Sequence, residues 1–189
     1  MKCAIMQPTF FPWSGYFCLI NEVDKFIFLD DAQFSKGSWH NRNKIFLANK
    51  VSWLTLPIKK KDLFTLINEI EITDVKILNN KINTKIKEAY QNHKYFSCII
   101  EIMDFLEKLE TINLSEINIS IIKFISLKLG INKVNFIKSS DLKIKGKRTE
   151  KIISILNKVS ATSYISPPGA HDYLSQDNYG LNTNIPLSF

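Results

Sequence analysis

The chain of 189 residues is long enough to bury a core of its own, and its formal net charge at pH 7 is +7. Hydrophobic residues make up 45% of it and charged residues 23%, which excludes an intrinsically disordered chain, and no apolar run approaches the ~20 residues of a membrane-spanning helix. The cysteines Cys3, Cys18 and Cys98 are far apart and predict neither a disulfide framework nor a metal site. We therefore expect a reduced, cytoplasmic protein with no membrane span and no bound metal.

The N-terminal residues predict a strand, a helix and a second strand. Lys2 to Gln7 is a short apolar run that ends at Pro8, which is typical of a buried strand. Ser14 is expected to cap a helix from about Gly15 to Glu22. Lys25 to Leu29 is a second apolar run, so the segment predicts a βαβ unit.

The next segments predict a hairpin and then three helices. Asn43 to Leu47 and Val51 to Ile58 are β-like runs separated by a short turn. Residues 74–92 carry apolar side chains with a period close to that of an α-helix. Two more helices are expected from Tyr95 to Leu109 and, capped by its first residue, from Ser115 to Leu129.

The last third of the chain returns to strands. Val134 to Ile137 and Ser163 to Ser166 predict strands, and a helix is expected between them from Thr149, as its N-cap, to about Val159. The whole pattern predicts a single α/β domain over residues 1–189, with a parallel sheet, a β-hairpin and a helical insert at about 74–130.

Positive charge is concentrated at both ends of the chain. There are 9 basic and 5 acidic residues between 1 and 62, 9 and 9 between 63 and 133, and 7 and 4 between 134 and 189. This distribution predicts one anionic small-molecule ligand held between N- and C-terminal loops, and no nucleic-acid partner, because a nucleic-acid track spreads its basic groups. Aromatic residues mixed with basic ones leave single-stranded nucleic-acid binding as an alternative.

The first motif is the loop after the first strand, Gln7-Pro8-Thr9-Phe10-Phe11-Pro12-Trp13-Ser14-Gly15-Tyr16. In an open parallel sheet, ligands bind outside the carboxyl ends of the strands, where loops lead into helices. We therefore predict that Gln7, Trp13, Gly15 and Tyr16 bind substrate, with Gly15 letting a ligand approach the backbone closely. The alternative is a hydrophobic plug between the strand and its helix.

The second motif, residues 30–43, follows the second strand. A paired carboxylate can serve as a general base, because its neighbour raises one pKa of the pair, so we predict that Asp31 is catalytic. Arg42 and Lys36 suit contact with a carboxylate or phosphate. The predicted substrate-binding residues are Asp30, Gln33, Lys36, Trp39, Asn41 and Arg42. The alternative is a polar loop in which Asp30 or Asp31 pairs with Lys36 or Arg42.

The third motif, residues 166–173, follows the last predicted strand. His171 can exchange a proton near neutral pH, and Asp172 can orient it, so both are predicted to be catalytic. Ser166, Gly169 and Tyr173 are predicted to bind substrate. The alternative is a tight turn that carries an exposed histidine.

A basic segment, Gly146 to Thr149, precedes a predicted helix. It is not a Walker A loop, because Arg148 separates the lysine from the threonine. Thr149 can be a plain N-cap, or the helix N-terminus can hold a phosphate together with Arg148. On the second interpretation, Arg148 and Thr149 bind substrate.

The first motif resembles the nucleotidylyltransferase signature, in which a strand is followed by an aromatic residue, proline and His-x-Gly-His. The two histidine positions hold Trp13 and Tyr16 here. Because those histidines stabilise phosphates in that superfamily, the resemblance implies its Rossmann-like fold and not its reaction.

Taken together, the motifs resemble the WbqC-like protein family, which is found with bacterial O-antigen genes. The resemblance rests on Gln7 to Phe17, Phe28 to Lys36, Trp39 to Asn43, Trp53 to Ile58 and Tyr164 to Leu174. It implies a cytoplasmic role in surface-polysaccharide precursor synthesis, and a glycine transferase has been proposed for one member. Members of this family continue past the equivalent of the last residue, so we expect the family's sequence to extend beyond this chain.

The resemblance and the charge distribution predict a transferase that joins an amino acid to the carboxylate of a sugar precursor. Amide formation needs ATP or another activated acyl donor. Asp31 or His171 would remove the amine proton, while Trp13, Tyr16 and Trp39 would stack on the sugar or base. The alternative is a non-catalytic nucleotide- or sugar-binding module in the same pathway, which the replaced histidines favour.

Overall fold

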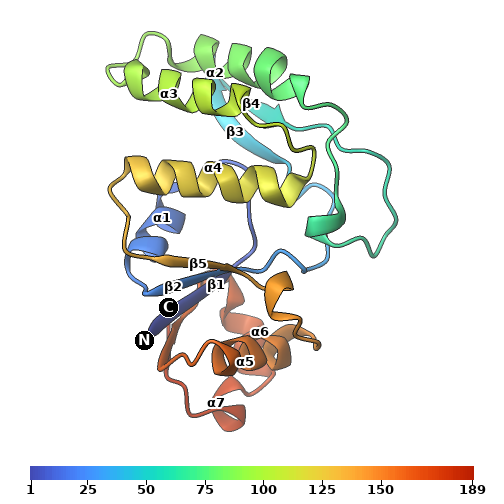
Figure 1. Cartoon of the computed structure of the whole chain (residues 1–189), viewed down its shortest axis with the longest axis vertical. Helices are drawn as coiled ribbons and strands as arrows, with labels where there is room; N and C mark the ends of the chain where they lie inside the picture. Colours follow the sequence, from blue (N-terminus) through green and yellow to red (C-terminus); the bar gives the residue numbers. More distant parts are fainter. The chain divides into compact units, whose positions relative to one another are not determined.

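The chain folds into two units that each draw on separate stretches of sequence. The computed structural model describes residues 1–189 (Figure 1). Unit 1 comprises residues 1–7, 13–31 and 129–189, and unit 2 comprises residues 8–12 and 32–128. The organisation as a single domain stays a prediction.

Five parallel strands form the sheet of unit 1. Their order across the sheet is β5-β2-β1-β6-β7, so the direction of chain progression reverses between the neighbours β1 and β6. The strands are β1 (Lys2–Met6), β2 (Lys25–Phe28), β5 (Asn135–Lys138), β6 (Ser163–Ile165) and β7 (Leu187–Ser188). The predicted parallel sheet is confirmed, and β7 is an additional strand.

The helices of unit 1 lie on both faces of this sheet, with α1 on one side and α5 and α6 on the other (Figure 1). None of the helices in the chain has both the length and the apolar character that crossing a bilayer requires. Unit 1 contains α1 (Ser14–Asn21), α5 (Arg148–Lys158), α6 (His171–Gln176) and α7 (Tyr179–Asn182), with the short turns η3 (Ser140–Leu142) and η4 (Pro168–Ala170).

Alternating side chains of the strands pack on opposite faces. Cys3 and Ile27 belong to a core cluster with Ile155 of α5. On the other face, the ring of Phe26 lies 5.3 Å from that of Tyr16 in α1. Because both faces are covered, β1 and β2 consist of nearly continuous apolar residues, which made them predictable.

Two predicted helix caps in unit 1 are wrong. Ser14 is the first residue of α1, and Trp13 is its N-cap. Thr149 lies inside the first turn of α5, whose N-cap is Lys147. A cap residue stands before the helix and accepts a bond from a backbone N–H, whereas Thr149 is the second residue of α5 and its hydroxyl donates to Asp177 Oδ2 at 2.8 Å.

An antiparallel hairpin of β3 (Arg42–Leu47) and β4 (Lys50–Thr55) forms the only strands of unit 2, as predicted. Its two turn residues, Ala48 and Asn49, have φ of 49° and 60°, the left-handed conformation of a type I′ turn. This turn matches the twist of the strands, although alanine rarely adopts it.

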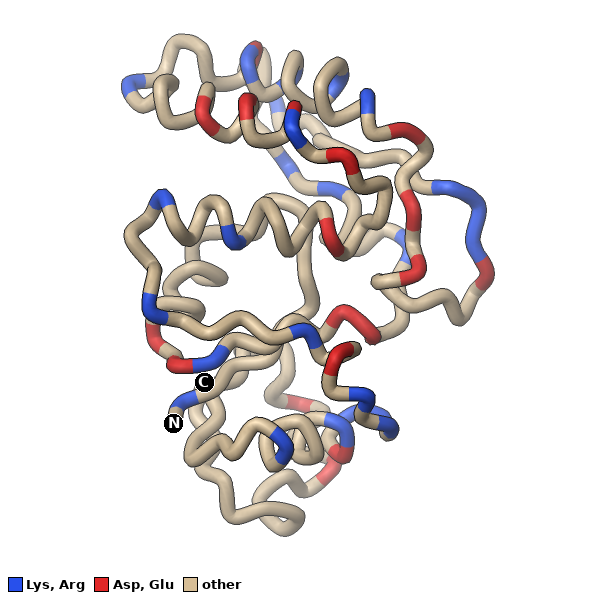
Figure 2. Tube along the Cα trace, viewed as in Figure 1, with Lys and Arg blue, Asp and Glu red and all other residues tan.

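The other regular elements of unit 2 are helical. They are α2 (Asn83–Tyr90), α3 (Phe96–Glu107) and α4 (Leu114–Lys128), with a π-helical turn η2 (Leu78–Ile82) and a 3-10 turn η1 (Ile67–Glu69). Basic and acidic residues are interspersed along them (Figure 2), in line with the balanced charge of this region. The predicted Ser115 cap is wrong, because Asn113 Oδ1 accepts from Glu116 N at 3.1 Å and Ser115 is buried within α4.

A buried asparagine of α4 joins two loops of unit 2. Asn118 is fully buried, and its Nδ2 donates to the carbonyl oxygen of Pro8 at 3.1 Å and to that of His40 at 2.8 Å. Phe10 N also donates to Trp39 O at 2.9 Å. The segment 8–12 of the first motif is therefore bonded directly to the second motif.

We predict that Asn118→Ala lowers the free energy of unfolding by about 2–4 kcal/mol, because two buried carbonyl groups lose their donor. Ser126→Ala is the matched control, since Ser126 is also fully buried on α4 and its hydroxyl has no hydrogen-bond partner. The control should be neutral or stabilising in urea unfolding. Equal losses in both variants would contradict the role of Asn118.

Candidate functional site

Two strand ends of unit 1 meet at the buried carboxylate of Asp30. This residue follows β2 and is only 2% exposed. It accepts bonds from Ser140 N at 3.0 Å, Ser140 Oγ at 2.6 Å and Ser139 Oγ at 3.0 Å, all just after β5. Asp30 therefore fixes the ends of neighbouring strands and offers little surface to a ligand.

The neighbouring Asp31 forms an ion pair with Lys151 of α5. Its Oδ2 lies 2.7 Å from Lys151 Nζ, and the two side chains are only 15% and 14% exposed. Its other oxygen, Oδ1, accepts from Ser139 Oγ, and Lys151 Nζ also reaches the Asp31 carbonyl oxygen at 3.3 Å. The predicted base is thus a partly buried carboxylate with a cation beside it.

The sheet reverses its order between β1 and β6, which is where ligands bind in open α/β sheets. Gln7 follows β1 and accepts a bond at its carbonyl oxygen from Tyr16 OH at 3.1 Å. Ser166 follows β6, is 1% exposed, and donates from its backbone N to Ser188 O at 2.8 Å. Two predicted substrate-binding residues therefore lie at the ends of the two strands that flank this point.

Trp13 occupies the space that Gly15 leaves open. A Cβ on Gly15 would lie 2.5 Å from Trp13 Nε1, so the glycine makes room for the indole in this structure. Trp13 is 57% exposed, and its edge packs on Tyr16 at 5.8 Å between ring centroids. Tyr16 is fully buried, and burial raises the pKa of its phenol well above its usual value. Its ring has no face open to a ligand.

The third motif is mostly at the surface. The His171 side chain is 61% exposed, its Nδ1 lies 3.5 Å from Asp172 Oδ1, and its ring lies 4.9 Å from that of Phe189. Gly169 lies in the exposed turn η4, with no atom close to the position of an added Cβ. His171 is accessible to a proton donor or acceptor from solution.

Arg148 forms a bidentate ion pair inside unit 1. Its Nε and Nη2 donate to the two carboxylate oxygens of Asp177 at 3.0 and 2.9 Å, and these bonds lower the pKa of that carboxyl group. Its guanidinium also lies 5.9 Å from the ring centroid of Tyr173. Arg148 and Thr149 line a hollow of about 440 Å³ together with Asp177, so the charge of Arg148 is already neutralised there.

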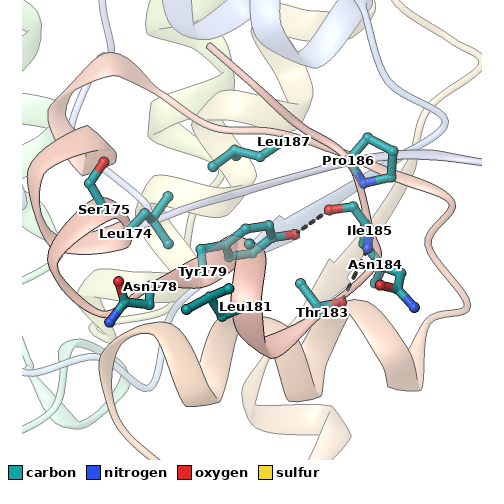
Figure 3. Close-up of a pocket in the computed structure, with 11 residues that line it drawn as sticks. Leu174, Ser175, Asn178, Tyr179, Leu181, Thr183, Asn184, Ile185, Pro186 and Leu187 are labelled. Atoms are coloured by element: carbon teal, nitrogen blue, oxygen red, sulfur yellow. Dashed lines mark hydrogen bonds between the residues drawn. The ribbon is translucent and has the colours of Figure 1, made fainter.

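A second hollow of unit 1, about 560 Å³, lies between Leu174 and Leu187 (Figure 3). Tyr179 OH donates to Ile185 O at 3.2 Å across this region, as Figure 3 shows. Its lining contains no charged side chain and none of the predicted site residues. It therefore lacks the cations that would hold an anionic ligand.

Unit 2 carries an exposed surface that we call the tryptophan platform, formed by Trp39, Arg42, Lys44 and Trp53. The two indole centroids are 5.7 Å apart, and their side chains are 49% and 38% exposed. The guanidinium carbon of Arg42 lies 4.2 Å and the ammonium of Lys44 5.3 Å from the Trp53 ring centroid. Such cation–π contacts hold the two cations against the face of the Trp53 ring.

The backbone at Gly37 orients Arg42. Arg42 Nε donates to Gly37 O at 3.1 Å, and Nη2 donates to the same oxygen. Gly37 has a φ of +79°, and a Cβ there would lie 3.1 Å from Arg42 Nη2. Glycine is therefore needed both for the turn and for the approach of the guanidinium.

The other predicted residues of the second motif hold loops of unit 2 together. Gln33 Nε2 donates to Leu63 O at 2.9 Å, and Asn41 Nδ2 donates to Leu56 O at 2.8 Å. Lys36 is exposed. Their bonds connect the second motif to the segment after β4.

His40 is a buried neutral histidine within the second motif. It is 3% exposed, and its Nδ1 lies 2.7 Å from Ser38 Oγ. Burial, with a smaller contribution from the charge of Lys61, lowers its pKa to about 4. It therefore packs as a neutral ring at physiological pH.

Sequence reasoning missed several residues of these clusters. Ser139 and Ser140 follow a parallel strand, as the aspartates do, so the rule that found Asp30 would also have found them. Lys151 gave no local signal, because its partner Asp31 lies 120 residues earlier.

Known proteins are similar to this chain over nearly its whole length. The sequence model of the WbqC-like protein family matches residues 7–189. The uncharacterized protein Rv1507c of Mycobacterium tuberculosis (strain ATCC 25618 / H37Rv) is 32% identical over 183 residues, which cover 93% of this chain and 76% of that protein. No solved structure matches the chain.

We predict that His40 makes folding sensitive to mild acid. Its pKa falls from 6.5 to about 4 on folding, so its contribution is complete above pH 6.5. As the pH drops toward 4, the unfolded chain binds a proton that the folded chain excludes, which costs about 3 kcal/mol. Urea unfolding at pH 7 and pH 4 should show this loss in the wild type and not in His40→Gln. Parallel pH profiles would contradict it.

We also predict that Lys151→Met lowers the free energy of unfolding by about 2 kcal/mol, because it leaves Asp31 partly buried without a cation. Lys128→Met is the matched control, since Lys128 pairs with Glu101 and both side chains are 49% exposed. The control should cost less than about 1 kcal/mol. Chemical denaturation of both variants measures the difference, and similar losses would count against a structural ion pair at the sheet edge.

Proposed function

The chain belongs to the WbqC-like protein family, and from this membership we propose that it is a cytoplasmic transferase of bacterial surface-polysaccharide (O-antigen) precursor synthesis. The proposed reaction joins an amino acid, such as glycine, to the carboxylate of an anionic sugar precursor or nucleotide sugar. ATP or another activated acyl donor supplies the activation.

The order of the strands supports a Rossmann-like sheet for this function. Numbered along the chain, the parallel strands follow the doubly wound order 3-2-1-4-5. Such sheets bind nucleotides where the order reverses, here between β1 and β6. A nucleotide-linked substrate fits this arrangement.

The observation that carries the proposal is the tryptophan platform. Arg42 and Lys44 have no carboxylate partner, and both lie against the ring of Trp53. Aromatic faces stack on sugars and bases, and unpaired cations attract carboxylates and phosphates. This combination favours an anionic sugar or nucleotide sugar over a neutral ligand.

The proposed chemistry forms one bond and breaks another. The amine nitrogen attacks the activated carbonyl carbon of the sugar acid, a C–N bond forms, and the C–O bond to the phosphate or AMP breaks with its electron pair leaving on that group. The amine proton passes to a base, for which Asp31 and His171 are the candidates. Lys151, beside Asp31, would offset negative charge on the leaving group.

The second candidate function is a non-catalytic sugar- or nucleotide-binding module. It is favoured by the environment of Asp31, whose two oxygens are already engaged by Lys151 and Ser139. On this alternative the tryptophan platform binds the same ligand without turnover.

We predict that Trp39→Ala weakens binding of UDP-glucuronate about tenfold, because one stacking face is lost. Phe46→Ala is the matched control, since Phe46 is an aromatic residue of β3 that is 62% exposed but lies outside the platform. Thermal shift and titration calorimetry measure both. No binding by the wild type, or equal loss in both variants, would contradict the platform as the site.

Turnover separates the two candidate functions. Mass spectrometry of UDP-glucuronate incubated with ATP and glycine should reveal the amide product with the wild type. Asp31→Asn and His171→Ala should keep binding, and the variant that lacks the base should lose product. If the wild type binds sugar acids but forms no product with any of them, the result would contradict the transferase and support the non-catalytic module.

A further inference from the structure

The loop of unit 2 between β4 and η1, residues 56–66, carries two large apolar side chains in solvent. Figure 2 shows this loop as a run of basic residues followed by an acidic one. Leu63 and Phe64 come directly after them, and we call these two residues the apolar tip. They are 75% and 77% exposed, and among the large hydrophobic residues of the chain only Leu181 is more exposed. Adjacent apolar side chains of this size in solvent indicate an interaction surface.

Hydrogen bonds within unit 2 hold the apolar tip in place. Phe34 N donates to Thr65 O at 2.9 Å, and Gln33 Nε2 donates to Leu63 O at 2.9 Å. The Thr65 hydroxyl donates to Asp62 O at 2.9 Å. Because these carbonyl groups have donors inside the protein, the tip can leave water without losing their hydrogen bonds.

The stretch of sequence that leads to the apolar tip is basic. Residues 32–61 contain seven lysine and arginine residues and no aspartate or glutamate. Lys60 is exposed, and the Lys61 ammonium lies 3.8 Å from the ring centroid of Phe34, in the loop after β2. Burial, with a smaller contribution from the charge of Lys36, lowers the pKa of Lys61, which shows that these two cations lie near each other.

Positive charge therefore exceeds negative charge beside the tip. Lys59 is neutralised by Glu71, whose Oε2 lies 2.6 Å from its ammonium. The loop pair then has Lys36, Lys60 and Lys61 outside ion pairs, against the single carboxylate of Asp62. A partner that suits this surface has an apolar interior and anionic groups around it.

A lipid bilayer with anionic headgroups has this chemistry. Apolar side chains enter the boundary between headgroups and acyl chains, while long lysine side chains keep their ammonium groups at the phosphates. Each lysine near such a surface contributes about 1 kcal/mol. A protein partner fits less well, because the side chains of two residues fall far short of the ~800 Å² that each partner buries in a stable complex.

We propose that unit 2 docks on an anionic lipid bilayer through the apolar tip and the lysines beside it. Leu63 and Phe64 enter the interface, and Lys36, Lys60 and Lys61 contact lipid phosphates. This docking does not depend on the transferase activity.

The test measures sedimentation of the whole chain with lipid vesicles. Binding to equimolar phosphatidylglycerol and phosphatidylcholine should be tight, and binding to phosphatidylcholine alone should be weak. Leu63→Ala should weaken binding to the anionic vesicles about tenfold. Leu181→Ala is the matched control, because Leu181 is 87% exposed but belongs to α7 of unit 1, and it should bind as the wild type does. No binding by the wild type, or equal losses in the two variants, would overturn the proposal.

The contribution of the lysines has its own control. Lys60→Glu should weaken binding to the anionic vesicles at least tenfold, because it replaces an attractive charge with a repulsive one. Lys87→Glu changes the net charge equally at an exposed position of α2, outside the basic loop, and should have little effect. If both variants lose binding equally, the attraction comes from net charge alone and the docking surface is wrong.

The depth of the apolar tip can be measured directly. Phe64→Trp should be quenched by vesicles of brominated lipids more strongly than the wild type, in which Trp13, Trp39 and Trp53 give the background fluorescence. Quenching equal to that of the wild type would place the tip outside the bilayer and overturn the proposal.

Discussion

A carbonyl group buried away from water needs a donor from the protein, and two loops of unit 2 obtain theirs from one side chain. Asn118 bonds to Pro8 and His40, and through them it holds the first and second motifs together. Phe10 N also donates to Trp39 O. This bond fixes the backbone of one tryptophan of the platform. The backbone that carries Trp39 of the tryptophan platform is therefore positioned by the Asn118 amide of α4.

The charged side chains of the motifs have different partners in the two units. In unit 1 the charged side chains of the motifs are paired within the unit, Asp31 with Lys151 and Arg148 with Asp177. In unit 2 the cations Arg42 and Lys44 lie on an aromatic ring and have no anion beside them. The motif cations that lack a carboxylate partner thus lie in unit 2, while Lys151 and Arg148 of unit 1 are each paired with a carboxylate.

The local sequence pattern was enough to predict the sheet and the hairpin. β1 and β2 were predictable because helices cover both faces, which requires continuous apolar residues. The two-residue strand β7 was not predictable, since it is defined only by pairing with β6. The caps at Ser14 and Thr149 failed because a cap residue stands before the helix, whereas both residues lie in the first turn, and local pattern places helix ends only to within one or two residues.

In the candidate site, too, residue types were predictable from the local sequence, whereas contacts between distant residues were not. Arg42 and Trp39 were found from their residue types, but the ring that brings them together, Trp53, belongs to the other strand of the hairpin. The close pair of indoles, 5.7 Å apart, has a consequence for study of the protein. Strong transition dipoles this close together couple, so the two indoles are expected to give an exciton couplet in far-ultraviolet circular dichroism, and a molecule that binds between or over them would change it without any label.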